Sequence, residues 1–151
     1  MATLADNRRA HYDYDILEKV QAGLVLNGQE VKSIKSGRVN LAGSYILPRG
    51  NELFLVGANI PAYQVKNAPA DYNPERDRKL LLQKEELNLL IGKVREKGLT
   101  FVPLKVYTVK GQIKLELGVA KGKKKQDKRQ KLKKQDVERE MQRALKSQEF
   151  F

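Results

Sequence analysis

The strongest constraint on how this chain can fold is the uneven distribution of its basic and apolar residues. Residues 121–151 contain twelve Lys and Arg and five Asp and Glu, so they contribute +7 of the net charge of +12. Within them, residues 121–134 hold nine basic residues, one acidic residue and a single large apolar residue, Leu132. So little apolar surface does not offset the roughly 1 to 2 kcal/mol per residue that ordering the backbone costs. We therefore expect two parts: a folded body over residues 1–120, and a basic tail over residues 121–151 that is disordered when free and helical when bound.

The body shows the short apolar runs, separated by turn residues, that are typical of antiparallel β-structure. In the last run, Ile113, Leu115 and Leu117 point to one face of a strand, whereas Lys114 and Glu116 point to the other. We expect a strand at residues 12–16, with the apolar run 24–26 following a bulge at Gly23. Two hairpins are expected, one with strands 44–47 and 52–57 around the turn 48–51, and one with strands 101–109 and 112–120 around Lys110 and Gly111. A further strand is expected near Ile60.

Two helices are expected among these strands. Asn27 and Glu30 have the spacing of a capping box, and Gly37 suits the end of a helix, which predicts a helix over residues 28–36. Asn73 and Pro74 open a second and longer helical region. Its apolar residues share one face up to Gly98: Leu87, Leu90, Ile91 and Val94. Five or six short strands with a long helix before the last pair predict a mainly β protein, a small antiparallel barrel of the oligonucleotide-binding type.

The residues that most enzymes need are missing or isolated. The chain has no Cys and a single His, His11, which excludes disulfides, Cys-ligated zinc, a Cys nucleophile and a His-rich metal site. The segment GVAKGKK, residues 118–124, differs from a Walker loop in its glycine spacing, and Lys124 stands where Ser or Thr would hold magnesium. Glu85 and Glu86 suit the start of a helix. We expect no enzymatic activity, no cofactor, no metal and no small-molecule substrate.

The chain also lacks the segments that direct proteins into or across membranes. No apolar run approaches 18 residues, and the first fifteen residues lack the apolar core of a signal peptide. We expect a soluble cytoplasmic monomer with no membrane partner.

The positive charge favours a polyanionic partner, among which nucleic acid, a membrane surface and an acidic protein all come into question. A cluster near the N-terminus combines cations with rings that can contact exposed bases of folded RNA: Asn7, Arg8, Arg9, His11, Tyr12 and Tyr14. A basic edge, Arg76, Arg78 and Lys79, runs into an apolar ridge, Leu80–Leu82. The N-terminal cluster is explained equally well as a solvated arm. The basic edge is explained equally well as charged residues that commonly flank buried leucines. The tail is the stronger indication of RNA binding, because its cations would contact several phosphates.

Five segments together carry a family resemblance: NRRAHYDYDI (7–16), QAGLVLNGQEVKSIKSGRVNLAGSYI (21–46), FLVGANIPAY (54–63), RDRKLLLQKEEL (76–87) and GVAKGKKKQDKR (118–129). In order and spacing they resemble small protein B (SmpB), the SsrA-binding protein family, and they cover nearly the whole chain. The resemblance implies an oligonucleotide-binding-type barrel with about three helices that binds the tRNA-like domain of transfer-messenger RNA. It also implies delivery of that RNA to the vacant A site of a stalled ribosome, where the tail probes the decoding centre and the empty mRNA channel of the small subunit.

Matched to the family position by position, two sets of residues are expected to contact RNA. Together with the basic residues noted above, the set for transfer-messenger RNA is Asn7, Arg8, Arg9, Tyr12, Gln21, Glu30, Arg78, Lys79, Leu81 and Lys114. In the tail, Lys123, Lys124, Asp127, Lys128 and Arg129 match the family motif for the ribosomal decoding centre and mRNA path. The set expected there also includes Gln126, at a position that departs from the motif, and the other lysines of the basic run, Lys121, Lys131, Lys133 and Lys134. Glu30 lies in the helix with the capping box, and we expect it to hold structure as much as ligand.

Two positions depart from the family pattern. Gln21 stands where the family commonly has an acidic residue, which argues against a charged contact there and still permits hydrogen bonds to bases. Gln126 stands where His or an aromatic residue often precedes DKR, so stacking on a decoding-centre base would be weaker or replaced by amide contacts. The alternative to this function is a ribosomal protein or assembly factor that binds rRNA, since such proteins are also small, basic and extended by a tail. A hydrolase acting on RNA would need an acidic cluster or a His pair, and the sequence has neither.

Overall fold

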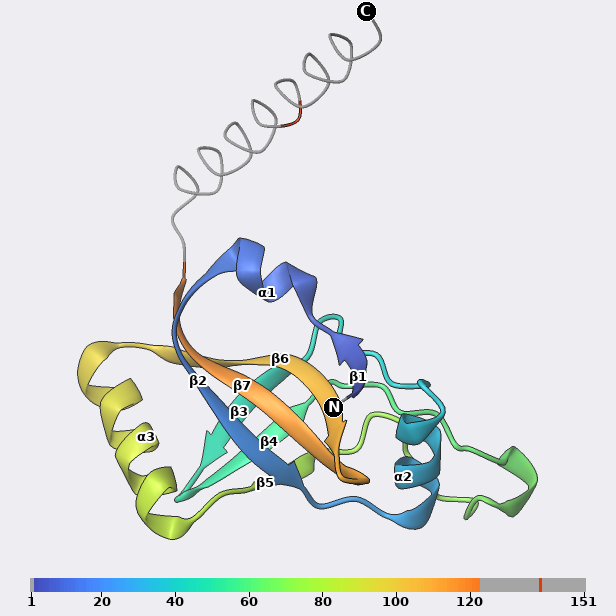
Figure 1. Cartoon of the computed structure of the whole chain (residues 1–151). Helices are drawn as coiled ribbons and strands as arrows, with labels where there is room; N and C mark the ends of the chain where they lie inside the picture. The colour runs from blue at the N-terminus through green and yellow to red at the C-terminus, as the bar shows by residue number, and fades with distance from the viewer. Residues whose placement is uncertain (1, 123–138, 140–151) are drawn as a thin grey trace, which may run out of the picture. The chain divides into compact units, whose positions relative to one another are not determined.

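The computed structural model of the chain describes residues 2–122 and 139 (Figure 1). Residues Met1–Lys121 form one compact unit. Its elements follow in the order β1 (Ala2–Asp6), α1 (Arg8–Asp13), β2 (Tyr14–Leu24), α2 (Gly28–Lys35), β3 (Tyr45–Arg49), β4 (Glu52–Val56), the 3-10 turn η1 (Val65–Asn67), β5 (Arg78–Leu81), α3 (Lys84–Lys97), β6 (Thr100–Val109) and β7 (Gln112–Gly122).

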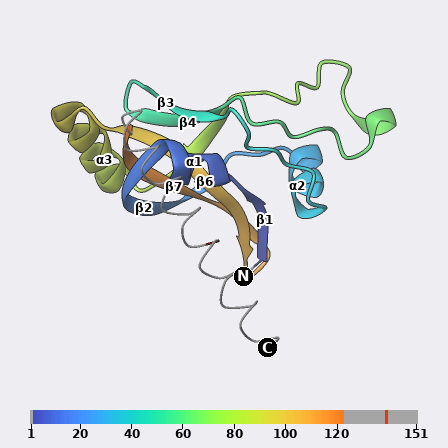
Figure 2. The same ribbon diagram turned by 90° about the horizontal axis from the view of Figure 1, so that it is seen from above.

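The strands form one seven-stranded sheet in the order β1-β6-β7-β2-β5-β4-β3. The pairs β1–β6, β6–β7, β2–β5, β4–β5 and β3–β4 are antiparallel. Helices α2 and α3 lie at opposite sides of the strands in both views (Figure 1 and Figure 2). For residues 2–122, the prediction of a mainly β, antiparallel protein with about three helices is confirmed. The sheet is not closed by hydrogen bonds, however, because β1 and β3 remain as its two edges.

The main core lies on the inner face of this sheet. Leu53 and Leu55 of β4 and Leu115 and Leu117 of β7 are at most 1% exposed, and Ile34 of α2 is buried against the same cluster. A second, smaller cluster lies beneath α1 and consists of Ala10, Val102, Leu104 and Ala120, with Tyr14 and Ile16 packed against it. The short helix α1 therefore covers the part of the sheet that the main core does not reach.

Two kinds of prediction that depend on residues close together in sequence, the capping box and the hairpin turns, are confirmed. The Asn27 side chain accepts a hydrogen bond from the Glu30 backbone N–H, and the Glu30 carboxylate accepts one from the Asn27 N–H, each at 2.9 Å. The two predicted hairpins form with Arg49 opposite Glu52 and Val109 opposite Gln112. In the second hairpin, Lys110 and Gly111 have φ values of 50° and 77°, as a tight two-residue turn requires.

Four expectations need correction. Tyr12 lies in α1, and β2 begins at Tyr14 and continues past Gly23 to Leu24, with no shift of register in its pairing with β5. Only an isolated bridge, Asn40 to Asn59, occurs near Ile60. The region after Asn73 and Pro74 contains β5 before the helix starts at Lys84. β1 was not expected. Both β1 and β5 depend on partners that are far away in sequence, so local patterns do not identify them.

Candidate nucleic-acid interface

The outer faces of β6, β7 and β2 together form a basic surface. Paired residues share a face of a sheet, and Lys105 lies opposite Glu116 and Tyr107 opposite Lys114 in the β6–β7 register. Lys19 of β2 contacts Glu116 from the other side, and Gln21 follows two residues later on the same face. We call this surface the sheet face; its polar members are Lys19, Gln21, Lys105, Lys114 and Glu116.

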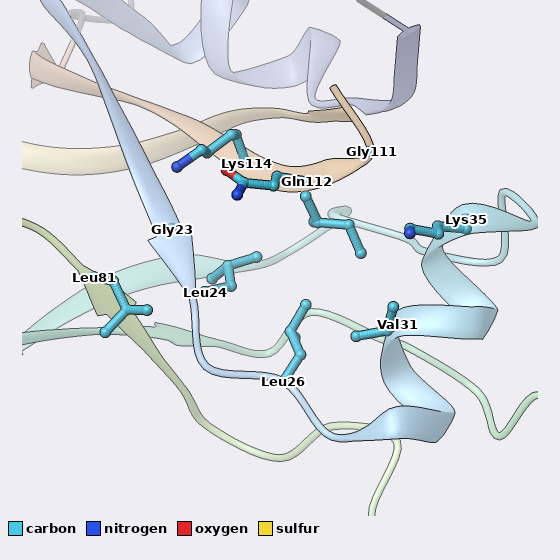
Figure 3. Close-up of a pocket in the computed structure, with 10 residues that line it drawn as sticks. Gly23, Leu24, Leu26, Val31, Lys35, Leu81, Gly111, Gln112 and Lys114 are labelled. Carbon is cyan, nitrogen blue, oxygen red and sulfur yellow. The ribbon is translucent and has the colours of Figure 1, made fainter. Parts of the chain in front are cut away.

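A groove of about 350 Å³ lies at one end of the sheet face (Figure 3). Leu81 of β5 and Lys114 of β7 both line it, and Figure 3 shows them on either side of Gly23. Leu24, Leu26 and Val31 supply an apolar wall, and the Leu81 side chain is 51% exposed. An exposed leucine beside a lysine suits a ligand that offers both a flat apolar group and a negative charge, as a nucleotide does.

Gly23 allows β2 and β5 to approach closely at this groove. It lies opposite Leu81 in the β2–β5 register. A Cβ atom at position 23 would lie 3.2 Å from the Cβ of Leu81, which is closer than most side-chain contacts allow. The absence of a side chain thus keeps Leu81 in place and the floor of the groove open.

Glu30 lies at the centre of a buried polar network behind the groove. Its carboxylate is 0% exposed and accepts hydrogen bonds from Arg76 Nη2 and Arg78 Nε, both at 2.6 Å. Burial alone would raise the pKa of Glu30, but hydrogen bonds from Arg76, from the Asn27 backbone and from Arg78 lower it below its usual value. Arg76 also donates to the Val25 carbonyl oxygen at 3.2 Å, which links the network to the chain that enters α2.

Arg78 is as deeply buried as Glu30. Its side chain is 0% exposed and also donates to the carbonyl oxygens of Ala58, at 2.7 Å, and Pro74, at 2.9 Å. In this structure neither Glu30 nor Arg78 is accessible to RNA, although both were expected among the residues that contact it. Lys79, the next residue of β5, is 42% exposed and lies 3.4 Å from Glu52.

The predicted N-terminal cluster lies on α1 and its two flanking residues, Asn7 and Tyr14, and α1 stands at the opposite end of β2 from α2 (Figure 1). Asn7 Nδ2 donates to the Pro103 carbonyl oxygen at 2.8 Å, so this side chain attaches α1 to β6. Arg9 is 77% exposed, pairs with Asp13 at 3.3 Å, and has its guanidinium carbon 5.5 Å from the centre of the Tyr12 ring. Arg8 is exposed. Asn7 and Arg9 line a second cavity, of about 520 Å³, that also includes Tyr45.

The structure thus brings Leu81, Lys114 and Gln21 to one surface and places Arg8, Arg9 and Tyr12 on another element. Lys121 is exposed at the end of β7. The other predicted tail residues, Lys123, Lys124, Gln126, Asp127, Lys128, Arg129, Lys131, Lys133 and Lys134, lie outside the described residues.

Sequence reasoning missed Lys19, Lys105 and Gly23 as members of this surface. The alternation along β7 gave the faces of Lys114 and Glu116, but only strand pairing shows which lysines of β2 and β6 lie beside them. In residues 2–122, no three His, Cys, Asp or Glu side chains are grouped so that they could hold a metal ion. No helix of that part of the chain is long and apolar enough to cross a membrane.

Comparison with known proteins gives consistent matches along the chain. The family model described as "SmpB protein" matches residues 4–147. An SsrA-binding protein of Chloroflexus aggregans is 48% identical over 146 residues, which are 97% of this chain and 92% of the relative. The SsrA-binding protein of Salinispora arenicola is 51% identical over 141 residues, 93% of this chain and 88% of the relative. A solved chain described as "tmRNA-SmpB: a journey to the center of the bacterial ribosome" is 49% identical, with a TM-score of 0.63 over 80% of this chain and 84% of that one.

Proposed function

The chain belongs to the SmpB protein family, and we propose that it binds the tRNA-like domain of transfer-messenger RNA and delivers this RNA to the A site of stalled ribosomes. The observation that carries the proposal is the similarity to SsrA-binding proteins at 46 to 51% identity over nearly the whole chain. The factor acts in trans-translation as an RNA-binding protein of the cytoplasm. It works as a monomer, without cofactor and without catalysing a reaction.

The groove between Leu81 and Lys114 is the central contact for transfer-messenger RNA. Leu81 packs on an unstacked base or ribose, and Lys114 neutralises an adjacent phosphate. Gln21, with an exposed side chain on the same face, supplies hydrogen bonds in place of the charge that the family commonly has there. Arg9 and Tyr12 form a second contact from α1, and Arg8 and Lys79 add phosphate contacts. Glu30 and Arg78 support this surface from behind, because their network fixes the chain between β2 and α2.

The body acts as a partly open barrel of the oligonucleotide-binding type. Its support is the strong curvature of the sheet, since residues 45–48 of β3 line the same cavity as residues 100–103 of β6 although the two strands are not paired. Such barrels bind nucleic acid on an outer strand face, which agrees with the position of the sheet face.

The basic tail, residues 121–151, makes the contacts with the ribosome. Its nine Lys and Arg between residues 121 and 134 bind small-subunit rRNA along the empty mRNA channel, and Asp127, Lys128 and Arg129 reach the decoding centre. The tail becomes helical there and reports that no mRNA is present.

Affinity capture of the full chain from a bacterial lysate, followed by sequencing of the bound RNA, tests the proposal. We expect one tRNA-like species to be enriched in the bound RNA far above its share of the lysate. The double variant Leu81→Ala/Lys114→Ala is the matched control and should lose this species. Enrichment of rRNA alone, equal for both proteins, would favour a ribosomal protein or an assembly factor.

A further inference from the structure

A carboxylate stands in the middle of the otherwise basic sheet face. Glu116 of β7 lies between two lysines of the neighbouring strands, with Lys105 Nζ 3.5 Å from its Oε2 and Lys19 Nζ 3.9 Å from its Oε1. Its side chain is only 17% exposed, so water screens its charge incompletely. A negative charge at this position repels phosphate, and a surface selected only for affinity to RNA would not carry it.

The two ion pairs of Glu116 are loose enough to be exchanged. At 3.5 Å and 3.9 Å they are much longer than the 2.6 Å pair of Lys93 with Glu18, a residue that projects from the opposite face of β2. Partly exposed pairs of this kind contribute little to stability. Lys19 and Lys105 can therefore leave Glu116 for a phosphate, but only if the carboxylate then finds another partner.

The charge of Glu116 also acts on a neighbour. Tyr107 lies on the sheet face, opposite Lys114, and is 1% exposed. Burial raises the pKa of Tyr107, and the charge of Glu116 raises it further. Among the described residues the Tyr107 hydroxyl has no hydrogen-bond partner, so the centre of the face combines one negative charge with an unpaired polar group.

We propose that Glu116 is the specificity-determining residue of the sheet face. Its carboxylate occupies Lys19 and Lys105 and so competes with any phosphate that approaches them. A polyanion that brings only phosphates must displace a charge that then stays unpaired and partly buried. An RNA that also presents a hydrogen-bond donor, such as a base amino group or a ribose 2′-hydroxyl, pairs the carboxylate while its phosphates take the lysines. The inference rests on the proposed function, because it concerns how the same face selects the tRNA-like domain.

The test compares the full chain with its Glu116→Gln variant, which keeps the shape of the side chain and removes the charge. Dissociation constants are measured over a series of salt concentrations for the tRNA-like domain and for a duplex RNA of equal length. Without the carboxylate, Lys19 and Lys105 can contact phosphates of the duplex. The affinity of the variant for the duplex should therefore rise about five- to tenfold, and the salt slope of this binding should steepen by about 1 to 2 units. Affinity for the tRNA-like domain should rise less or fall, so the preference for it shrinks.

Glu18→Gln is the matched control, since it breaks a lysine pair of the same strand on the other face and should change neither affinity nor slope. Thermal unfolding of both variants establishes that they are folded. Equal gains on both RNAs, or no change on either, would overturn the specificity role of Glu116. A wild-type protein that binds the two RNAs equally well would overturn the proposed function as well.

Discussion

Glu30 and Arg78 form an ion pair in which both side chains are 0% exposed. Removing one charge of such a pair leaves the other buried and uncompensated, at a cost of about 3 to 5 kcal/mol. We expect Glu30→Gln to lower the free energy of unfolding by about that amount in urea titrations. Glu52→Gln, which breaks the half-exposed pair with Lys79, is the control and should cost under about 1 kcal/mol.

The Glu30–Arg78 pair should also make the stability of the fold depend on pH, in a direction that follows from the pKa of Glu30. Because its hydrogen bonds lower the pKa of folded Glu30 below the ordinary value of 4.5, the carboxylate stabilises the fold fully above that value. The stabilisation is lost as the pH falls from about 4.5 through the lower pKa of the folded state. The wild type should thus lose more stability over this range than Glu30→Gln does, and parallel curves for the two proteins would contradict the assignment.

Lys114 and Leu81 line one groove but should contribute to RNA binding in different ways. Replacing Lys114 or Arg9 by Ala removes a phosphate contact, so affinity should fall and the salt slope should become shallower by about 0.7 to 0.9 per residue. Leu81→Ala should weaken binding with nearly the same slope, because a leucine releases no counterions. Filter binding at several salt concentrations distinguishes the two, and equal slopes in all variants would refute the electrostatic role of the lysine and the arginine.

At the scale of elements, the contact between β2 and β5 depends on Gly23. We expect Gly23→Ala to push Leu81 outward, because the new Cβ would lie 3.2 Å from the Cβ of Leu81. RNA affinity should fall several-fold, with a loss of unfolding free energy of about 1 kcal/mol or more, as is usual for an overpacked contact. Gly28→Ala is the matched control, since nothing lies within 4 Å of its Cβ position. Equal binding by the two variants would show that the approach of these strands is unimportant.

The elements that could be predicted from sequence are those whose signals are local. The capping box of α2 and the turn of the β6–β7 hairpin involve residues within a few positions of each other, and both form as predicted. β5 was missed because Asn73 and Pro74 suggested a helix start, whereas pairing with both β2 and β4 makes the segment a strand. β1 has little apolar pattern and exists because β6 pairs with it.

The same distinction holds for the candidate site. Leu81 and Lys114 were identified through the family resemblance, and they line one groove. Arg78 was expected on a basic surface, but alternation along β5 turns it inward, where Glu30 compensates its charge. A run of basic residues in the sequence does not show which of them face the core. To identify the inward-facing residue, one must know the strand that contains it and the buried acidic residue that pairs with it.

At the scale of the whole molecule, the body should bind transfer-messenger RNA without the tail. A chain that ends at Gly122 keeps β7 complete, together with the sheet face, the groove and α1. We expect its affinity for the tRNA-like domain to lie within about tenfold of the full chain, which is 1.4 kcal/mol. Filter binding at fixed salt measures this affinity, and a larger loss of affinity would mean that residues 123–151 contribute to binding that RNA.

The tail should be needed for a later step. Replacing Asp127, Lys128 and Arg129 together by Ala lowers the net charge by only one, so a tail that acts through charge alone would tolerate it. If Arg129 makes a directional phosphate contact and Asp127 positions it or caps a helix, the variant binds transfer-messenger RNA and the ribosome but does not support tagging of the nascent chain. A tail of scrambled sequence and equal composition should fail likewise. Normal tagging by both proteins on ribosomes stalled on truncated mRNA would contradict a defined register.

The pairing of β1 with β6 sets the order in which the protein can fold while it is being made. Ala2 and Thr3 pair with Thr108 and Tyr107, so the first strand to leave the ribosome waits for partners that are synthesised about 100 residues later. β2 likewise has one neighbour in β5 and the other in β7. In a nascent chain that stops before β6, β1 has no partner, β2 is paired only with β5, and the inner faces of β4 and β5 are exposed. We expect such a chain to be a substrate for chaperones and proteases. With the proposed function, synthesis of this factor would itself be sensitive to the interrupted translation that the factor resolves.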